Sequence, residues 1–221
     1  MDWRTWHDRY DLGGSWLERR LQAVQSQIRA ALDRSPSGPL QVISLCAGQG
    51  RDLLGVLADH PRRDDVRARL VELDPRNTAF AGDLVRAADL DQVEVVTADA
   101  SLTDQYRGMV PADLVLVCGV FGNIADADID RTIDACSQLC RTGGTVIWTR
   151  HRAEPDRVPL ICERFATRGF DLQWLSEREA GFGVGAHRFT GEPQRLASGV
   201  QLFGFIGYDV LKQANTEADG A

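Results

Sequence analysis

The stretch of sequence that decides the fold reads Val42-Ile43-Ser44-Leu45-Cys46-Ala47-Gly48-Gln49-Gly50-Arg51-Asp52. Its first half is an apolar run that predicts a buried strand, and its glycines predict a tight turn into a helix. A strand followed by a glycine turn and a helix lets the backbone come close to a ligand. A glycine turn alone is also compatible with a tight connection that binds nothing, so the assignment needs support from the rest of the chain.

Strands and helices alternate around this stretch. Amphipathic spacing predicts a helix over residues 15–33, ahead of the glycine turn. Further strands are expected over 40–46, 66–73, 93–97, 113–118 and 144–149, and helices over 52–57, 77–88 and 126–139. Such alternation is typical of a parallel sheet covered on both faces, so we predict a Rossmann-like, doubly wound, mostly parallel α/β sandwich.

The pattern changes after residue 151. A helix is expected over 157–167 and strands over 170–175, 182–189 and 200–206, which predicts an antiparallel C-terminal edge on the sheet. No clear domain boundary interrupts the chain. We expect an N-terminal helical cap over residues 1–39, one main domain over 40–210 and a flexible tail over 211–221.

Carboxylates follow the next two predicted strands. Glu72 ends the second strand, at the spacing of about 20 residues after the glycine turn at which an acid binds ribose hydroxyls. Asp99 ends the third strand, where a carboxylate can accept a hydrogen bond from an adenine amino group. Either acid alone could be a solvent-exposed carboxylate at the end of a strand that binds no ligand. A glycine turn and two acids at three successive strand ends together indicate a nucleoside site.

In this order the signals resemble the motifs of the class I S-adenosylmethionine-dependent methyltransferases. The similar segments are residues 44–50, 71–75, 97–100, 112–124 and 139–147. The resemblance spans about residues 40–150. It implies the three-layer fold of that family, S-adenosylmethionine as cofactor, S-adenosylhomocysteine as product, and transfer of a methyl group.

The resemblance also implies which residues meet the cofactor. They are Cys46, Ala47, Gly48, Gln49, Gly50, Glu72, Leu73, Asp74, Asp99, Ala100, Cys118, Gly119 and Val120. Among them, the glycines would approach the methionine part and Glu72 would hold the ribose. Two positions depart from the family pattern, because Ser44 replaces a frequent acid and Cys46 replaces a glycine. These departures leave the contact to the amino group of the cofactor unassigned.

Several neighbouring functions lack their sequence signals. The segment Cys118-Gly119-Val120-Phe121 is not the Asp/Asn-Pro-Pro-aromatic motif of nucleic-acid amino methyltransferases, and no Pro-Cys nucleophile occurs. A dinucleotide turn would carry a third glycine where this chain has Leu53. The formal net charge of -7 also disfavours a nucleic-acid partner. A small-molecule methyl acceptor is therefore expected.

The cellular setting is predicted from composition. No apolar run approaches the roughly 18–20 residues of a membrane span, and the N-terminus has no signal-peptide pattern. The five cysteines are an odd number scattered through apolar stretches, which indicates reduced thiols and no metal cluster. We therefore expect a cytoplasmic protein with no membrane partner, present as a monomer or homodimer.

Candidates for the acceptor side are His151 as a base, Tyr10 on an aromatic N-terminal stripe, and Asn123 after the fourth strand. Phe121 and Arg150 are further candidates, and His187 is a weaker one. The stripe could equally dock a helix, and His151 could be an ordinary surface histidine. The leading hypothesis is methyl transfer to an O or N nucleophile. The alternatives are a non-catalytic cofactor- or partner-binding protein and a protein or RNA methyltransferase.

Overall fold

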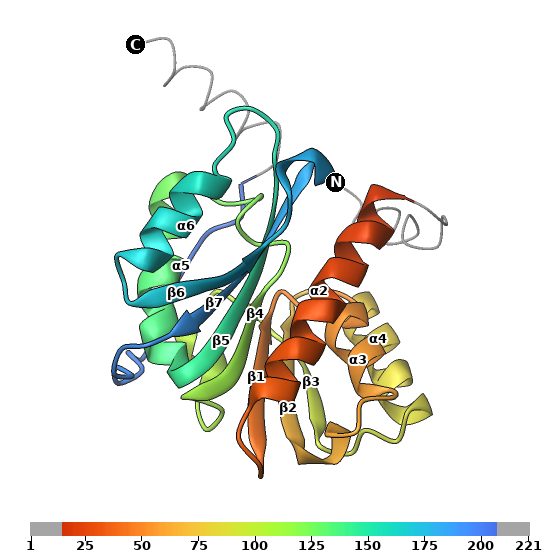
Figure 1. The fold of residues 1–221 in the computed structure, drawn as a ribbon. Helices are drawn as coiled ribbons and strands as arrows, with labels where there is room; N and C mark the ends of the chain where they lie inside the picture. The colour runs from red at the N-terminus through yellow and green to blue at the C-terminus, as the bar shows by residue number, and fades with distance from the viewer. Residues whose placement is uncertain (1–14, 207–221) are drawn as a thin grey trace.

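The structure, a computed structural model, describes residues 15–206. Seven strands form one sheet in the order β3-β2-β1-β4-β5-β7-β6 (Figure 1). They are β1 (Leu40–Leu45), β2 (Val66–Glu72), β3 (Val93–Thr97), β4 (Ala112–Val117), β5 (Cys140–His151), β6 (Phe170–Leu175) and β7 (Phe182–Phe189). The first five are parallel, and β7 lies antiparallel between β5 and β6. The predicted Rossmann-like α/β fold with an antiparallel C-terminal edge is confirmed.

Helices cover both faces of this sheet. On one face lie α2 (Trp16–Arg34), α3 (Arg51–Leu57) and α4 (Pro75–Ala87), and on the other α5 (Asp126–Leu139) and α6 (Val158–Ala166) (Figure 1). Short 3-10 turns occupy Arg63–Asp65, Thr103–Tyr106 and Arg178–Ala180. Each helical layer buries its own hydrophobic cluster against the sheet. The sheet is therefore buried on both faces, as its continuous apolar strands require.

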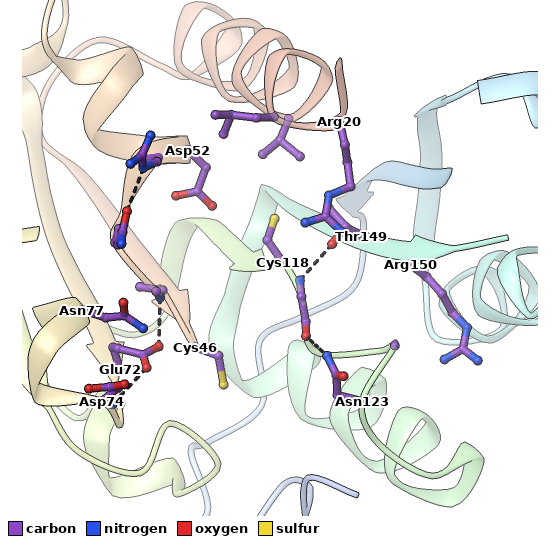
Figure 2. A pocket seen from close by; sticks show the side chains of 18 of the residues that line it. Arg20, Cys46, Asp52, Glu72, Asp74, Asn77, Cys118, Asn123, Thr149 and Arg150 are labelled. Carbon is purple, nitrogen blue, oxygen red and sulfur yellow. Dashed lines mark hydrogen bonds between the residues drawn. The ribbon is translucent and has the colours of Figure 1, made fainter. Parts of the chain in front are cut away.

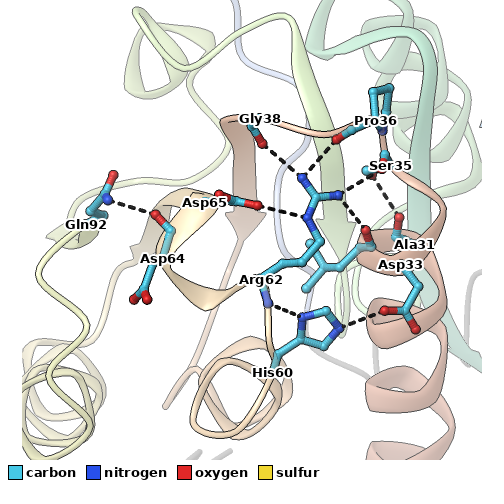
Figure 3. A network of polar contacts seen from close by, with 11 residues as sticks. Ala31, Asp33, Ser35, Pro36, Gly38, His60, Arg62, Asp64, Asp65 and Gln92 are labelled. Atoms are coloured by element: carbon cyan, nitrogen blue, oxygen red, sulfur yellow. Dashed lines mark hydrogen bonds and ion pairs between the residues drawn. The ribbon is translucent and has the colours of Figure 1, made fainter.

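Helix α2 is set by a cap at its start and an anchored loop at its end. The side chain of Ser15 accepts a hydrogen bond from the Glu18 amide, which satisfies one of the unpaired donors of the first turn. Beyond the helix, the Arg62 guanidinium donates to carbonyl groups around the α2–β1 loop and pairs with Asp65 (Figure 3). This single side chain ties the end of α2 to the entry of β1.

The predicted strand over 200–206 is wrong. The segment forms one isolated antiparallel bridge, Leu102 to Gln201, made by the backbone bonds from the Leu202 amide to Ser101 and from the Thr103 amide to Val200. Its one further backbone–backbone bond runs from the Ile206 amide to the Asn123 carbonyl. Its apolar side chains, Leu202 and Phe203, pack into the cluster on the α5 side of the sheet. The apolar residues of this segment are therefore explained by their burial and not by pairing with the sheet.

Candidate functional site

A cavity of about 650 Å³ opens at the carboxyl ends of the parallel strands (Figure 2). It lies where the strand order reverses between β1 and β4, which is the position at which open α/β sheets bind ligands. Its volume is within the range of small-molecule pockets. The predicted residues that line it are Cys46, Ala47, Gly48, Gln49, Glu72, Leu73, Asp74, Cys118, Gly119, Asn123 and His151.

The glycine turn begins directly after β1. The backbone takes positive φ values at Cys46, Gly48 and Gly50, so the chain coils tightly before α3 starts. The Ala47 amide donates to the Val71 carbonyl, which fixes the turn against β2. The turn therefore brings its backbone close to the cavity, and the Cys46 side chain is among the groups that line it (Figure 2).

Glu72 connects this turn with the next helix. One carboxylate oxygen accepts from the Gly48 amide at 2.9 Å, and the other accepts from the Asp74 amide at 3.0 Å. Asp74 itself caps α4 and pairs with Arg76, so its carboxylate is engaged in the helix start. Leu73 beside it is 66% exposed and offers an apolar surface to the cavity. A carboxylate beside an exposed apolar side chain at the end of β2 is the combination expected for the ribose and base of a nucleoside.

Four of the predicted cofactor residues lie outside the cavity lining. Gly50 is buried under the turn, and Ala100 and Val120 are buried in the core. Asp99 is exposed, and its carboxylate accepts from the Ser101 amide. The end of β3 therefore sits beside the cavity without contributing a side chain to its wall.

The end of β4 is held from two sides. The Gly119 amide donates to the Thr149 hydroxyl at 2.8 Å, and the Gly119 carbonyl accepts from the Asn123 side-chain amide at 2.7 Å (Figure 2). The nitrogen of Asn123 thus positions the turn after β4. Burial raises the pKa of the Cys118 thiol well above its usual range, so this thiol is neutral at physiological pH.

His151 lies at the edge of the cavity, with its ring against Gly122. Its Nδ1 accepts from the Ala153 amide at 3.3 Å, so the neutral ring carries its proton on Nε2. This tautomer makes Nε2 a donor, which disfavours the predicted role as a base. Arg150 also lines the cavity and donates to the Phe121 carbonyl.

Other acceptor-side predictions fall elsewhere. Phe121 and His187 are fully buried in an aromatic cluster with Trp148 and Phe165, so they do not face the cavity. Tyr10 and the aromatic stripe to which it belongs lie outside the described residues 15–206.

The sequence reasoning missed part of the wall. Trp16, Arg20, Leu21 and Val24 of α2, with Asp52, Asn77, Thr149 and Phe205, also line the cavity. The amphipathic spacing over residues 15–33 predicts a helix but does not indicate that this helix reaches the cavity. The sequence signal that could have revealed Arg20 is weak, because a charged residue on an amphipathic helix is ordinary.

Comparison with known proteins supplies a family. A family model described as "Putative methyltransferase" matches residues 11–179. No curated protein matches the sequence.

Among the described residues, no helix combines the length and apolarity needed to cross a bilayer.

Solved structures share the fold at low sequence identity. An O-methyltransferase family protein from Burkholderia thailandensis superposes with a TM-score of 0.62 and 16% identity, covering 79% of this chain and 56% of that one. Magnesium protoporphyrin IX methyltransferase from Synechocystis PCC 6803, with bound SAM, superposes with a TM-score of 0.61 and 15% identity, covering 77% of this chain and 80% of that one. The 1,6-didemethyltoxoflavin-N1-methyltransferase of Burkholderia thailandensis, with bound 1,6-didemethyltoxoflavin and S-adenosylhomocysteine, superposes with a TM-score of 0.58 and 18% identity, covering 83% of this chain and 87% of that one.

Proposed function

Because the chain belongs to this family of methyltransferases, we propose that it transfers a methyl group from S-adenosylmethionine to an oxygen or nitrogen of a small molecule. The observation that carries the proposal is the Glu72 carboxylate, which meets the glycine turn inside a cavity at the switch point of the sheet. When bound, the cofactor supplies a methyl group on a cationic sulfur, and S-adenosylhomocysteine leaves with the electron pair of the broken bond.

The residues of the cavity fit this cofactor. Glu72 is placed to accept hydrogen bonds from the two ribose hydroxyls, and Leu73 offers a surface for the adenine ring. The backbone of Gly48 can approach the ligand because this glycine carries no side chain. The protein mainly orients the reactants and excludes water, since the reactive group belongs to the cofactor.

The acceptor side favours a small molecule. The cavity reaches past the end of β4 to Asn123 and His151, and the net charge of -7 opposes binding to a nucleic-acid backbone. His151 lies at the edge of this side of the cavity, and Asn123 positions the turn after β4. Tyr10 remains a candidate for the same side.

Calorimetric titration tests the cofactor assignment. Wild-type protein should bind S-adenosylmethionine and S-adenosylhomocysteine, and Glu72→Ala should weaken both by about 10- to 100-fold, because the ribose loses charge-assisted hydrogen bonds. Asp91→Ala, which removes an exposed acid before β3, is the matched control and should bind as wild type. Absence of wild-type binding, or unchanged binding by a folded Glu72→Ala protein, contradicts the proposal.

A labelling experiment tests the acceptor class. Protein is incubated with methyl-labelled S-adenosylmethionine and with separated small-molecule, protein and RNA fractions of a cell extract. Label transferred within the small-molecule fraction supports the proposal. Label found only in protein or RNA would assign the enzyme to a different acceptor class, and binding without transfer to any fraction would favour a non-catalytic protein.

A further inference from the structure

Two side chains of opposite charge face the cavity beside the end of β4. Asp52 comes from the first turn of α3, and Arg20 comes from near the start of α2 (Figure 2). The Cys118 thiol lies between them and donates a hydrogen bond to Asp52. The Asp52 carboxylate also accepts from the Leu53 amide, and the Arg20 guanidinium lies over the Trp16 ring, so both charged groups are held at this wall of the cavity.

The order of the strands fixes which end of a cofactor reaches these charges. The strands run β3-β2-β1-β4 across the sheet, and in the proposed function Glu72 would hold the ribose at the end of β2. A molecule held there and lying over the turn after β1 points its remaining part toward the end of β4. For S-adenosylmethionine, that part is an amino acid with one ammonium and one carboxylate group.

The position where an acid would be expected for the ammonium is not available. Ser44 stands there, within β1, and it is buried with its hydroxyl unpaired and outside the cavity lining. No carboxylate follows β4 directly, since Cys118 and Gly119 occupy that place. Asp52 instead brings a carboxylate to the same end of the cavity from α3.

We infer that Asp52 and Arg20 form the subsite for the zwitterionic end of the cofactor, with Asp52 accepting from the ammonium and Arg20 donating to the carboxylate. This inference rests on the proposed function. Asp52 thereby replaces the acid that is missing at Ser44.

The electrostatics of Asp52 agree with this role. Burial raises the pKa of the Asp52 carboxyl, while the Leu53 amide, the Arg20 guanidinium and the Cys118 thiol each favour its charged form. An ammonium group bound beside it would favour the charged form further. The subsite would therefore be completed by the ligand, and it discriminates against molecules that lack the amino acid end.

Three ligands separate the two contacts. S-adenosylhomocysteine carries both charges, its decarboxylated analogue keeps only the ammonium, and 5′-deoxy-5′-methylthioadenosine carries neither. Asp52→Asn should weaken the first two by about tenfold or more and leave the third within twofold, because it removes a charge-assisted hydrogen bond to the ammonium. Arg20→Gln should weaken only S-adenosylhomocysteine.

Affinities are measured by calorimetry, with Asp91→Asn and Arg19→Gln as matched exposed controls that should bind all three ligands as wild type does. Unchanged binding of all three ligands by Asp52→Asn overturns the inference, and so does an equal loss for all three, because that would reflect a damaged cavity. Wild-type protein that binds none of the three contradicts the proposed function itself. Weaker binding of the decarboxylated analogue by Arg20→Gln would overturn the assignment of Arg20.

Discussion

Gly50 illustrates how one residue sets the geometry of the site without touching a ligand. It precedes α3 with φ of 68°, and an added Cβ would lie 2.7 Å from a Leu70 methyl and 2.9 Å from a Leu54 methyl. Both the backbone and the space therefore require glycine. The sequence predicts Gly50 as a cofactor contact, whereas the structure buries it under the turn and outside the cavity lining.

Gly50→Ala should lower the free energy of unfolding by about 2–4 kcal/mol, since it adds overpacking to left-handed strain. Urea unfolding measures the loss. Gly108→Ala is the control, because Gly108 has φ of 75° but no atom within 4 Å of an added Cβ, so it should show the strain alone. Equal losses in the two variants would mean that the contacts with Leu70 and Leu54 cost nothing.

At the same scale, sequence spacing predicted which acids follow strands but not where their side chains point. Glu72 enters the cavity because it is drawn in by two backbone amides, from Gly48 and Asp74. Asp99 turns instead to the Ser101 amide and stays in solvent. The position at a strand end fixes where the Cα atom lies, and the nearby hydrogen-bond donors determine the direction of the side chain.

Among the elements, α2 depends on a side chain from outside the helix. Arg62 is mostly buried, with 17% of its side chain exposed, and it donates to the carbonyls of Leu32, Ser35, Pro36 and Gly38 (Figure 3). These carbonyls have few other donors because the helix has ended and the loop has no ladder. The planar fork of an arginine can reach them together, which a lysine cannot.

Arg62→Lys should therefore lower the free energy of unfolding by about 1–2 kcal/mol, since several acceptors, most of them partly buried, lose their donors. Arg67→Lys, at an exposed position on β2, is the matched control and should change stability by less than about 0.5 kcal/mol. Chemical denaturation of the two variants gives the comparison. A loss for Arg62→Lys no larger than for Arg67→Lys would show that the loop holds without this anchor.

Element prediction succeeded where a periodic pattern had one cause. The strands of the parallel sheet are buried on both faces, so in these strands an apolar run indicates both burial and pairing in the sheet. In 200–206 these causes separate, because Leu202 and Phe203 are buried while the backbone pairs only at Gln201. Sequence alone does not distinguish an apolar strap from a strand.

On the scale of the whole molecule, the cavity is assembled from distant parts of the chain. Trp16 and Arg20 come from the helix before the first strand, and Phe205 comes from the segment after the last. The sheet topology was predictable from alternation, but the approach of these two ends depends on packing that no local pattern encodes. For this reason the sequence predicts the residues of the glycine turn and the end of β2 that line the cavity, but not the part of its wall that α2 and Phe205 supply.

The buried His187 gives the whole fold a pH dependence. Its side chain is 0% exposed, accepts a hydrogen bond from Trp148 Nε1 and stacks on Phe165. Burial lowers the pKa of His187 from 6.5 to about 4. Above pH 6.5 the ring is neutral in both states, so it adds no pH dependence. Below pH 6.5 the His187 ring binds a proton in the unfolded chain but stays neutral in the folded chain. The free energy of unfolding therefore falls as the pH is lowered, until the pH reaches about 4.

The total loss from this group is about 3 kcal/mol, and it should be absent from His187→Gln, whose amide oxygen can still accept from Trp148 but does not titrate. Urea unfolding of both proteins between pH 7.5 and 4.5 isolates the effect, because acidic groups such as Asp104, whose pKa a backbone hydrogen bond from Gly199 lowers, contribute equally to both. The free energy of unfolding of the wild type should fall more steeply below pH 6.5. Parallel curves would mean that the aromatic cluster opens enough to hydrate the protonated ring.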